Sequence, residues 1–431
     1  MLGAEFLLYT FLNIKCFPFK MKEIEIMAPA GSWESLTAAI KAGADSVYFG
    51  VEKLNMRARA ANNFKVDELK RIVEVCDKHK IKSYLTLNIV LYDDELTEMK
   101  LLCGAAKEAG VSAVIAADVA AIQYANSIGL EVHISTQANV SNLEAVKFYS
   151  TYADVIVLAR ELTLDKIKYI IEEIKSKKIR GPSGNLIRIE LFIHGAMCVS
   201  ISGKCYMSLA TYNHSANRGD CLQTCRRKYK VTDEETGNEL VIDNEYVMSP
   251  KDMCTITFLN QLLDSGVTVL KIEGRGRSAD YVNTVVSSYR AAVDLYKKKQ
   301  LTDVKAKELL KDLESVFNRG FWHGGYYLGN KLGEWAGVYG SKATKKKEFI
   351  GQIQNYYSKN KAASLLIETG SLNLGDECLI TGPTTGVLQF RIKEIMKDEK
   401  IVGEASKGDV VSFEVKEKVR KNDKMYVLKK V

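Results

Sequence analysis

The sequence predicts an α/β protein: a (β/α)8 barrel of the TIM type followed by a small C-terminal all-β barrel domain. Two patterns indicate this architecture. Through about residue 340 one unit recurs, consisting of a helical stretch, a glycine where the helix stops and a short β-branched run. From Glu348 onward the pattern changes to short alternating runs separated by turn residues, which is typical of antiparallel β-structure.

The repeated unit predicts eight parallel strands. Gly43, Gly110, Gly129 and Gly266 each stand where a helical stretch stops, which suits a left-handed helix end. The runs that follow are apolar enough for strands covered on both faces. We expect these strands near residues 24–28, 46–50, 83–88, 113–117, 131–136, 154–158, 187–193 and 268–273. Eight strands alternating with helices favour the barrel, and an open doubly wound sheet is the alternative.

The alternation is interrupted once, between the seventh and eighth predicted strands. An insertion at about residues 194–266 stands there in place of the usual crossover. In a barrel this segment leaves the C-terminal end of a strand, which is the face where catalytic groups are found. The chain has nine cysteines, and five of them lie in this insertion. Position and composition both make it the candidate functional segment.

Three segments are expected along the chain. Residues 1–21 are apolar over a run shorter than the ~20 residues that a membrane-spanning helix needs, and they lack a basic n-region. We treat them as an N-terminal extension without a functional role. The barrel is expected over residues 22–340 and the β-domain over residues 348–431. Gly-Asp turns at 375–376 and 408–409 make the β-domain resemble the barrel modules appended to translation factors, which suggests RNA.

The composition is that of a compact soluble protein. Hydrophobic residues make up 46% and charged residues 26%, with only five prolines, which argues against extended disorder. Lys and Arg outnumber Asp and Glu by 61 to 53, an excess that permits a polyanionic partner without requiring one. Many cysteines without a signal peptide indicate a reducing compartment. We therefore expect a cytoplasmic protein that has no membrane partner, and the oligomeric state is not indicated.

Four cysteines form the strongest motif in the sequence. They are Cys198, Cys205, Cys221 and Cys225, with gaps of six, fifteen and three residues. An iron-sulfur cubane needs four soft anionic ligands on a flexible loop, and closely spaced cysteines supply them. Structural zinc would more often show two tight CxxC pairs or added histidines, and His214 is the alternative zinc ligand. Cys254 is a reserve ligand, although a neutral buried cysteine is its more usual role.

The cysteine motif lies in a stretch that resembles a known signature. The residues ELFIHGAMCVSISGKCYMS, from Glu190 to Ser208, resemble the full signature of the collagenase-like, PrtC-type peptidase family U32. The resemblance continues in MAPAGSWESL, NMRARAANNF, SPKD, KIEGRGRSADYV and the C-terminal barrel. It covers essentially everything after Met21.

The resemblance implies an RNA hydroxylase more than a peptidase. Members of the family are prephenate-dependent RNA hydroxylases that carry an iron-sulfur cluster and act on the tRNA wobble uridine or on a ribosomal RNA cytidine. The C-terminal barrel and the pair CLQTC look most like the branch of TrhP-type tRNA hydroxylation proteins, whose cluster cysteines the four cysteines match. The implied cofactor is a 4Fe-4S cluster, the implied co-substrate is prephenate and the implied partner is tRNA.

Polar residues at the predicted strand ends should converge on one pocket beside the cluster. These are Asn88, His133, Gln137, Arg160, Glu190, His194, Lys271, Glu273 and Arg275. Prephenate is a dicarboxylate, and the planar fork of arginine suits it, so Arg57, Arg59 and Arg275 are the expected anchors. Glu190, His194 and Glu273 are the candidates for moving protons.

Basic and aromatic residues around the cysteines are the candidates for binding RNA. Arg218, Arg226, Arg227 and Lys228 are the basic ones, interleaved with Tyr212 and Tyr229. Cations contact phosphate while aromatic rings stack on an extruded base. The alternative is that these charges only adjust the reduction potential of the cluster.

A peptidase would need a nucleophile with its base or a metal with an open position. The sequence has neither HExxH nor GxSxG, and its five histidines lie far apart. We interpret the chain as a prephenate-dependent tRNA uridine hydroxylase that forms 5-hydroxyuridine at the wobble position. A PrtC-type peptidase is the alternative, and a non-catalytic RNA-binding subunit is the third option.

Overall fold

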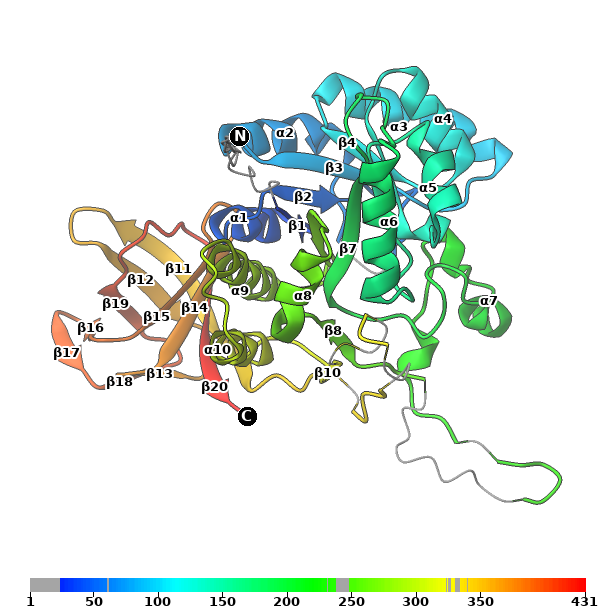
Figure 1. The fold of residues 1–431 in the computed structure, drawn as a ribbon. Coiled ribbons are helices and arrows are strands. Elements are labelled where there is room, and N and C mark those ends of the chain that lie inside the picture. The colour runs from blue at the N-terminus through cyan, green and yellow to red at the C-terminus, as the bar shows by residue number, and fades with distance from the viewer. Residues whose placement is uncertain are drawn as a thin grey trace, which may run out of the picture.

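The computed structural model describes residues 24–59, 62–230, 232–237, 248–322, 324, 327–329, 334–338 and 340–431. Within them, eight parallel strands close into a barrel (Figure 1). They are β1 (Glu25–Pro29), β2 (Ser46–Phe49), β3 (Lys82–Leu87), β4 (Ala113–Ala116), β5 (Val132–Ile134), β6 (Val155–Val157), β7 (Arg188–Gly195) and β9 (Val269–Ile272). Each overlaps a predicted strand, so the TIM-type barrel is confirmed. The extension at residues 1–21 lies outside the described residues.

Helices cover the outside of the barrel between successive strands. They are α1 (Trp33–Lys41), α2 (Leu69–Lys78), α3 (Leu96–Ala109), α4 (Val119–Ser127), α5 (Leu143–Ser150), α6 (Leu164–Ser176), α8 (Leu259–Asp264), α9 (Ala279–Lys297) and α10 (Asp303–Glu314). Short 3-10 turns are η1 (Val66–Glu68), η2 (Asp93–Glu95), η3 (Thr136–Ala138), η4 (Ala216–Arg218), η5 (Thr224–Arg226) and η6 (Ile256–Phe258). Side-chain oxygens of Ser32, Asp118 and Asn142 cap helix starts. The four predicted glycines have φ between 69° and 91°, so their left-handed conformation is confirmed.

The cysteine-bearing segment follows the C-terminal end of β7. It carries α7 (Met207–Tyr212) and then returns as β8 (Asp252–Cys254), which pairs antiparallel with the end of β7. A further short strand, β10 (Phe321–Trp322), pairs parallel with β8. The segment therefore leaves the C-terminal end of a barrel strand, as predicted.

The C-terminal region is antiparallel β-structure with its own hydrophobic core, as predicted. One sheet contains β11 (Lys345–Tyr357), β12 (Ala362–Ile367), β14 (Glu377–Gly382), β15 (Gly386–Arg391), β16 (Ile395–Lys397), β17 (Lys400–Val402), β19 (Val410–Glu414) and β20 (Lys424–Lys430). A second sheet pairs β13 (Ser371–Asn373) with β18 (Glu404–Ser406). Leu379 and Val387 of this region bury against Ala38 and Ala279 of the barrel helices. The region thus sits beside α1 and α9 (Figure 1).

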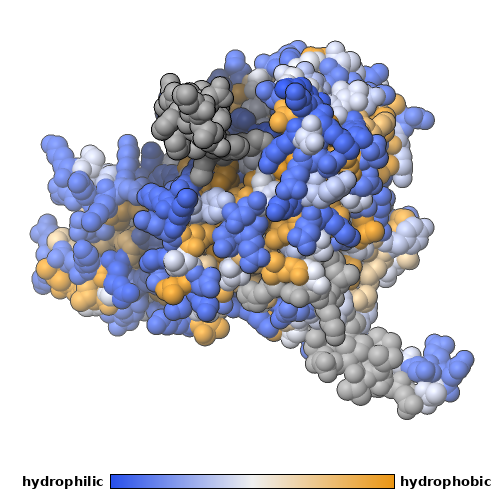
Figure 2. Space-filling view, in the orientation of Figure 1, coloured by the Kyte–Doolittle hydropathy of each residue, from blue (hydrophilic) through white to orange (hydrophobic). Residues whose placement is uncertain are grey.

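The face seen in Figure 2 is largely hydrophilic, with hydrophobic residues in small groups between hydrophilic ones. In the part of the chain that the structure describes, no helix combines the length and the apolar character needed to cross a membrane.

Candidate active site

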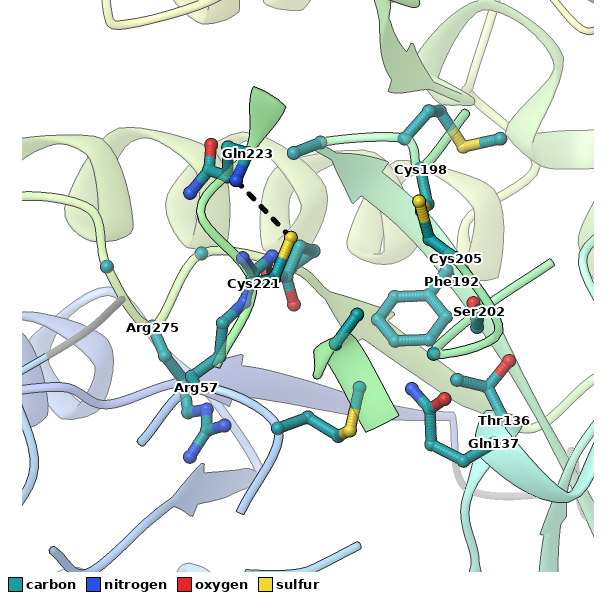
Figure 3. A pocket seen from close by; sticks show the side chains of 18 of the residues that line it. Arg57, Thr136, Gln137, Phe192, Cys198, Ser202, Cys205, Cys221, Gln223 and Arg275 are labelled. Carbon is teal, nitrogen blue, oxygen red and sulfur yellow. Dashed lines mark hydrogen bonds and ion pairs between the residues drawn. The ribbon is translucent and has the colours of Figure 1, made fainter. Parts of the chain in front are cut away.

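A cavity of ≈ 240 Å³ opens at the C-terminal end of the barrel strands. Its walls come from the strand ends, from the loop after β2 and from the cysteine-bearing segment (Figure 3). In a TIM barrel this is the end at which active sites are built. The predicted convergence of strand ends and cysteines is therefore present.

All four predicted cluster cysteines line this cavity: Cys198, Cys205, Cys221 and Cys225. Cys198 and Cys205 lie on one side and Cys221 on the other (Figure 3). Burial raises the pKa of the Cys225 thiol to about 11, and the other three thiols act in the same direction because they are near neighbours.

The two alternative ligands lie elsewhere. Cys254 is buried in β8, where burial raises the pKa of its thiol to about 12, which fits the neutral buried role. His214 is not among the cavity residues, and its Nδ1 contacts Asp220 and Arg59 instead. The donor set that remains consists of four thiols.

The chemistry of the four side chains is that of iron-sulfur ligands, which are soft and anionic. Cys198, Cys205, Cys221 and Cys225 would hold such a cluster with one thiolate each. Within the described residues, no three His, Cys, Asp or Glu side chains form a group that could hold a single metal ion.

Cationic side chains form the wall of the cavity near β1 to β3. Arg275 is buried and donates to Thr86 Oγ1 at 2.8 Å and to Asn55 Oδ1 at 3.0 Å. Burial lowers its pKa to about 10, which leaves it charged at neutral pH. Both hydrogen-bond partners are neutral, and among the described residues Arg275 forms no ion pair, although the nearby Glu273 acts on its pKa. Its charge is therefore suited to an anionic ligand.

Glu273 is the carboxylate of the same wall. Its Oε1 accepts from Arg57 Nη2 at 2.5 Å, and its Oε2 accepts from the Tyr48 hydroxyl at 3.2 Å. Burial alone would raise the pKa of the Glu273 carboxyl, but the charges of Arg57 and Arg275 outweigh it and hold that pKa at about 2. Glu273 is thus ionised, and it neutralises one of the arginines of the wall.

Two glycines make room for these groups. An added Cβ at Gly50 would lie 2.2 Å from Arg275 Nη1, and one at Gly203 would lie 2.0 Å from Gln137 Oε1. The amide of Gln137 lines the cavity beside Arg160. Asn88, also in the cavity, accepts from the Met56 amide at 3.1 Å and so holds the loop after β2 in place. Small residues at these two positions allow polar groups to face the cavity.

Sequence reasoning missed Arg277. It lines the cavity with its guanidinium stacked over Phe317 at 3.6 Å, and among the described residues it forms no ion pair. Burial lowers its pKa. Its position two residues after Arg275 in the same strand-end loop could have identified it. Arg319 was missed as well, although it is already paired with Asp252 at 3.2 Å.

Three residues predicted for the pocket do not reach it. His194 is buried among Tyr281, Tyr289 and Phe321, where burial lowers its pKa to about 3. The register of β7 against β9 shifts between Phe192 and His194, which breaks the alternation that would have turned His194 inward. The other two, Glu190 and His133, lie inside the barrel below the cavity.

Lys271 lies just above Glu190 and does line the cavity. Its Nζ donates to Glu190 Oε1 at 2.7 Å and lies 4.7 Å from the centroid of the Tyr48 ring. Arg59, in contrast, turns away and pairs with Asp220 at 2.9 Å. Of the three arginines predicted to bind a dicarboxylate, Arg57 and Arg275 line the cavity and Arg59 does not.

The predicted RNA-binding residues divide into internal and exposed ones. Arg218 holds both oxygens of the Glu95 carboxylate, at 2.5 and 2.6 Å. Arg226 donates to the carbonyls of Met197 and Pro250, so it fastens the cysteine segment. Arg227 and Lys228 are exposed beside it, and Arg227 stacks over Tyr212. Both side chains lie at the surface.

The family model described as Peptidase family U32 matches residues 31–337. The chain belongs to this family. It is 53% identical to a protein named "Collagenase" from Porphyromonas gingivalis, over 94% of this chain and 98% of that protein. It is 32% identical to "tRNA hydroxylation protein P1" from Bacillus subtilis, over 94% of each chain. It is 36% identical to "23S rRNA 5-hydroxycytidine C2501 synthase" from Escherichia coli, over 63% of this chain and 39% of that protein.

Proposed function

We propose that this U32 protein hydroxylates tRNA, forming 5-hydroxyuridine at the wobble position, with prephenate as co-substrate and a 4Fe-4S cluster on the four cysteines. The observation that carries the proposal is one cavity lined by four thiols and by Arg275 and Arg277, which form no ion pair among the described residues. The names of the relatives from Bacillus subtilis and Escherichia coli support RNA hydroxylation.

The cationic wall is suited to the two carboxylates of prephenate. Arg275 and Arg277 lie in one loop, and neither is paired with a carboxylate among the described residues. A bidentate Arg-carboxylate contact fixes orientation as well as adding affinity. Arg57, already held by Glu273, adds positive charge beside them. We assign Arg275 and Arg277 to the dicarboxylate.

The remaining wall is suited to a flipped base. Phe192 lines it with an aromatic ring, while Asn88 and Gln137 line it with amides. Extruded bases are read by stacking and by hydrogen bonds to their edges. Arg227 and Lys228 are exposed, and cations at the surface would support contact with the phosphate backbone. When bound, the cluster would supply electron transfer next to the base.

A peptidase is the second candidate, because the relative that is 53% identical is named "Collagenase". Nucleophilic peptidases need a base in contact with the nucleophile. Among the described residues, no histidine lines the cavity, and His194, a candidate from the sequence, is buried among tyrosines. The geometry thus favours hydroxylation.

Nucleoside mass spectrometry tests the proposal directly. The protein purified without oxygen is incubated with prephenate and with tRNA from a strain that lacks the gene. We expect 5-hydroxyuridine at the wobble position only when both are present, and loss of the product in Arg275→Ala while the iron-sulfur absorption is kept. A protein that cleaves gelatin and leaves the tRNA unchanged would favour the peptidase.

A further inference from the structure

The interior of the barrel is unusually polar. TIM barrels normally fill this space with branched aliphatic side chains. Here it holds Glu25, Tyr84, His133, Glu190 and Lys271, all nearly inaccessible to solvent. Burying charged groups is unfavourable unless they are paired. This column of five buried polar side chains therefore requires an explanation.

Three of these groups, His133, Glu190 and Lys271, form a line through the barrel that Glu131 extends to its N-terminal end. Glu131 stands at the N-terminal end of β5, where its side chain is 46% exposed and its Oε1 lies 3.2 Å from His133 Nε2. His133 Nδ1 faces Glu190 Oε2 at 4.0 Å. Glu190 Oε1 accepts from Lys271 Nζ at 2.7 Å, and Lys271 lines the cavity at the opposite end.

The one open contact in this line lies between two atoms that have no other partner. His133 Nδ1 and Glu190 Oε2 are both buried and both without a hydrogen bond. A buried polar atom left unpaired costs about 1–3 kcal/mol. Two such atoms facing each other destabilise the folded protein, so a purely structural role does not explain them. Hydrogen bonds between catalytic groups, in contrast, are often long in the free protein and shorten on ligand binding.

We propose that Glu131, His133, Glu190 and Lys271 form a proton relay that connects the cavity with solvent at the N-terminal end of the barrel. Lys271 is the member that touches the substrate, and the other three are relay residues. The inference rests on the proposed function, because bound tRNA would cover the C-terminal mouth and leave this line as the route for protons.

Each step of the relay moves one proton and leaves the electrons in place. Lys271 Nζ–H gives its proton to the reacting group in the cavity. His133, neutral with its proton at Nδ1, takes a proton at Nε2 from solvent beside Glu131. The protonated ring then gives its Nδ1 proton to Glu190 Oε2. Rotation of the Glu190 carboxyl presents that proton to Lys271, and reorientation of the neutral His133 ring resets the relay. The reverse sequence removes a proton from the cavity.

A crystal structure of the full chain, alone and with prephenate, tests the relay without any turnover. We expect the distance from His133 Nδ1 to Glu190 Oε2 to shorten to hydrogen-bond length, about 3 Å, or an ordered water to bridge the two atoms in at least one of the two states. A contact that stays open and dry in both states overturns the relay, whether or not the protein hydroxylates tRNA.

Single-turnover rates of hydroxyuridine formation give the second measurement. His133→Gly should lower the rate by roughly 10²-fold, and added imidazole should restore most of it, because the free base fills the gap in the line. Glu131→Gln, at the exposed end, should fold normally and lower the rate by less. Full rates in both variants would refute the relay.

Tyr84→Phe is the matched control. The Tyr84 ring lies 4.5 Å from the ring of His133, and its hydroxyl donates to Glu25 at 2.7 Å, beside the line but not in it. It should keep the wild-type single-turnover rate. An equal loss in this variant, without rescue of His133→Gly by imidazole, would show that the column is structural. A wild-type protein that forms no 5-hydroxyuridine would count against the proposed function, and the distance measurement would still decide the relay.

Discussion

Gly50→Ala should displace Arg275 and weaken dicarboxylate binding while the cysteines stay unchanged. The added Cβ would lie 2.2 Å from Arg275 Nη1 and 2.9 Å from Asn55 Cγ. Both neighbours are buried and hydrogen-bonded to each other at 3.0 Å, so neither can move aside without breaking that contact. The guanidinium must therefore leave the position from which it faces the cavity.

The size of the effect follows from the interaction that is lost. A hydrogen bond to a charged group contributes roughly 1.5–3 kcal/mol, so the dissociation constant for prephenate should rise by roughly 10- to 150-fold. Overpacking should also lower the free energy of unfolding by about 1–3 kcal/mol. Isothermal titration calorimetry with prephenate and urea unfolding measure the two effects separately.

Gly104→Ala is the matched control for this substitution. Gly104 lies within α3, and a Cβ added there would meet no atom within 4 Å. Replacing a helical glycine with alanine should stabilise the protein by about 0.5–1 kcal/mol and leave prephenate binding unchanged. If Gly50→Ala binds prephenate as tightly as the wild type does, then Arg275 is not the anchor of the dicarboxylate.

Three more outcomes are expected. The Cys221→Ser variant should lose the brown colour of the cluster, together with its roughly four iron and four sulfide per chain. Its unfolding temperature should change little. Zinc without sulfide in the wild-type protein would contradict the cluster. Glu273→Gln should lower the free energy of unfolding by roughly 2 kcal/mol, because it leaves Arg57 without its carboxylate. Since the pKa of Glu273 falls from 4.5 to about 2 on folding, this difference should be full above pH 4.5 and shrink toward pH 2 in urea titrations. Arg227→Ala should weaken tRNA binding in filter assays and reduce its salt dependence, whereas Arg218→Ala should mainly destabilise the protein; equal binding by the Arg227 variant would remove that surface from the RNA path.

The barrel could be predicted from sequence because its signals are local. Each strand is a short apolar run that follows a glycine at a helix end, and the burial of both faces makes the run continuous. The strands β8 and β10 could not be predicted, since three and two residues are too few to show a period. Their pairing depends on β7, which lies far away in sequence.

The site could be predicted from sequence only where the type of a residue, without its position in the fold, determines the chemistry. Four cysteines on one loop are visible in the sequence, but the direction of a side chain on β7 is not, because the register shift before His194 arises from its pairing with β9. Arg218 looked like an RNA contact because its partner Glu95 is distant in sequence. Ion pairs between residues that are far apart in the sequence therefore determine which basic side chains are held inside the protein.

The four cysteines also bear on why relatives of this chain carry names as different as collagenase and RNA hydroxylase. Thiols that face an accessible cavity are prone to oxidation, so four of them at the catalytic end of a barrel are a liability for an enzyme that has no use for them. Peptide hydrolysis requires one activated nucleophile or one metal-bound water, and neither calls for four soft ligands around a shared space. Beside them lie Arg275 and Arg277, which form no ion pair in the part of the chain that the structure describes and which peptide hydrolysis does not require either. The proposed function would give both sets of residues a role, the thiols as ligands of a cluster and the arginines as contacts of a dicarboxylate, and this is the reason to test tRNA before gelatin.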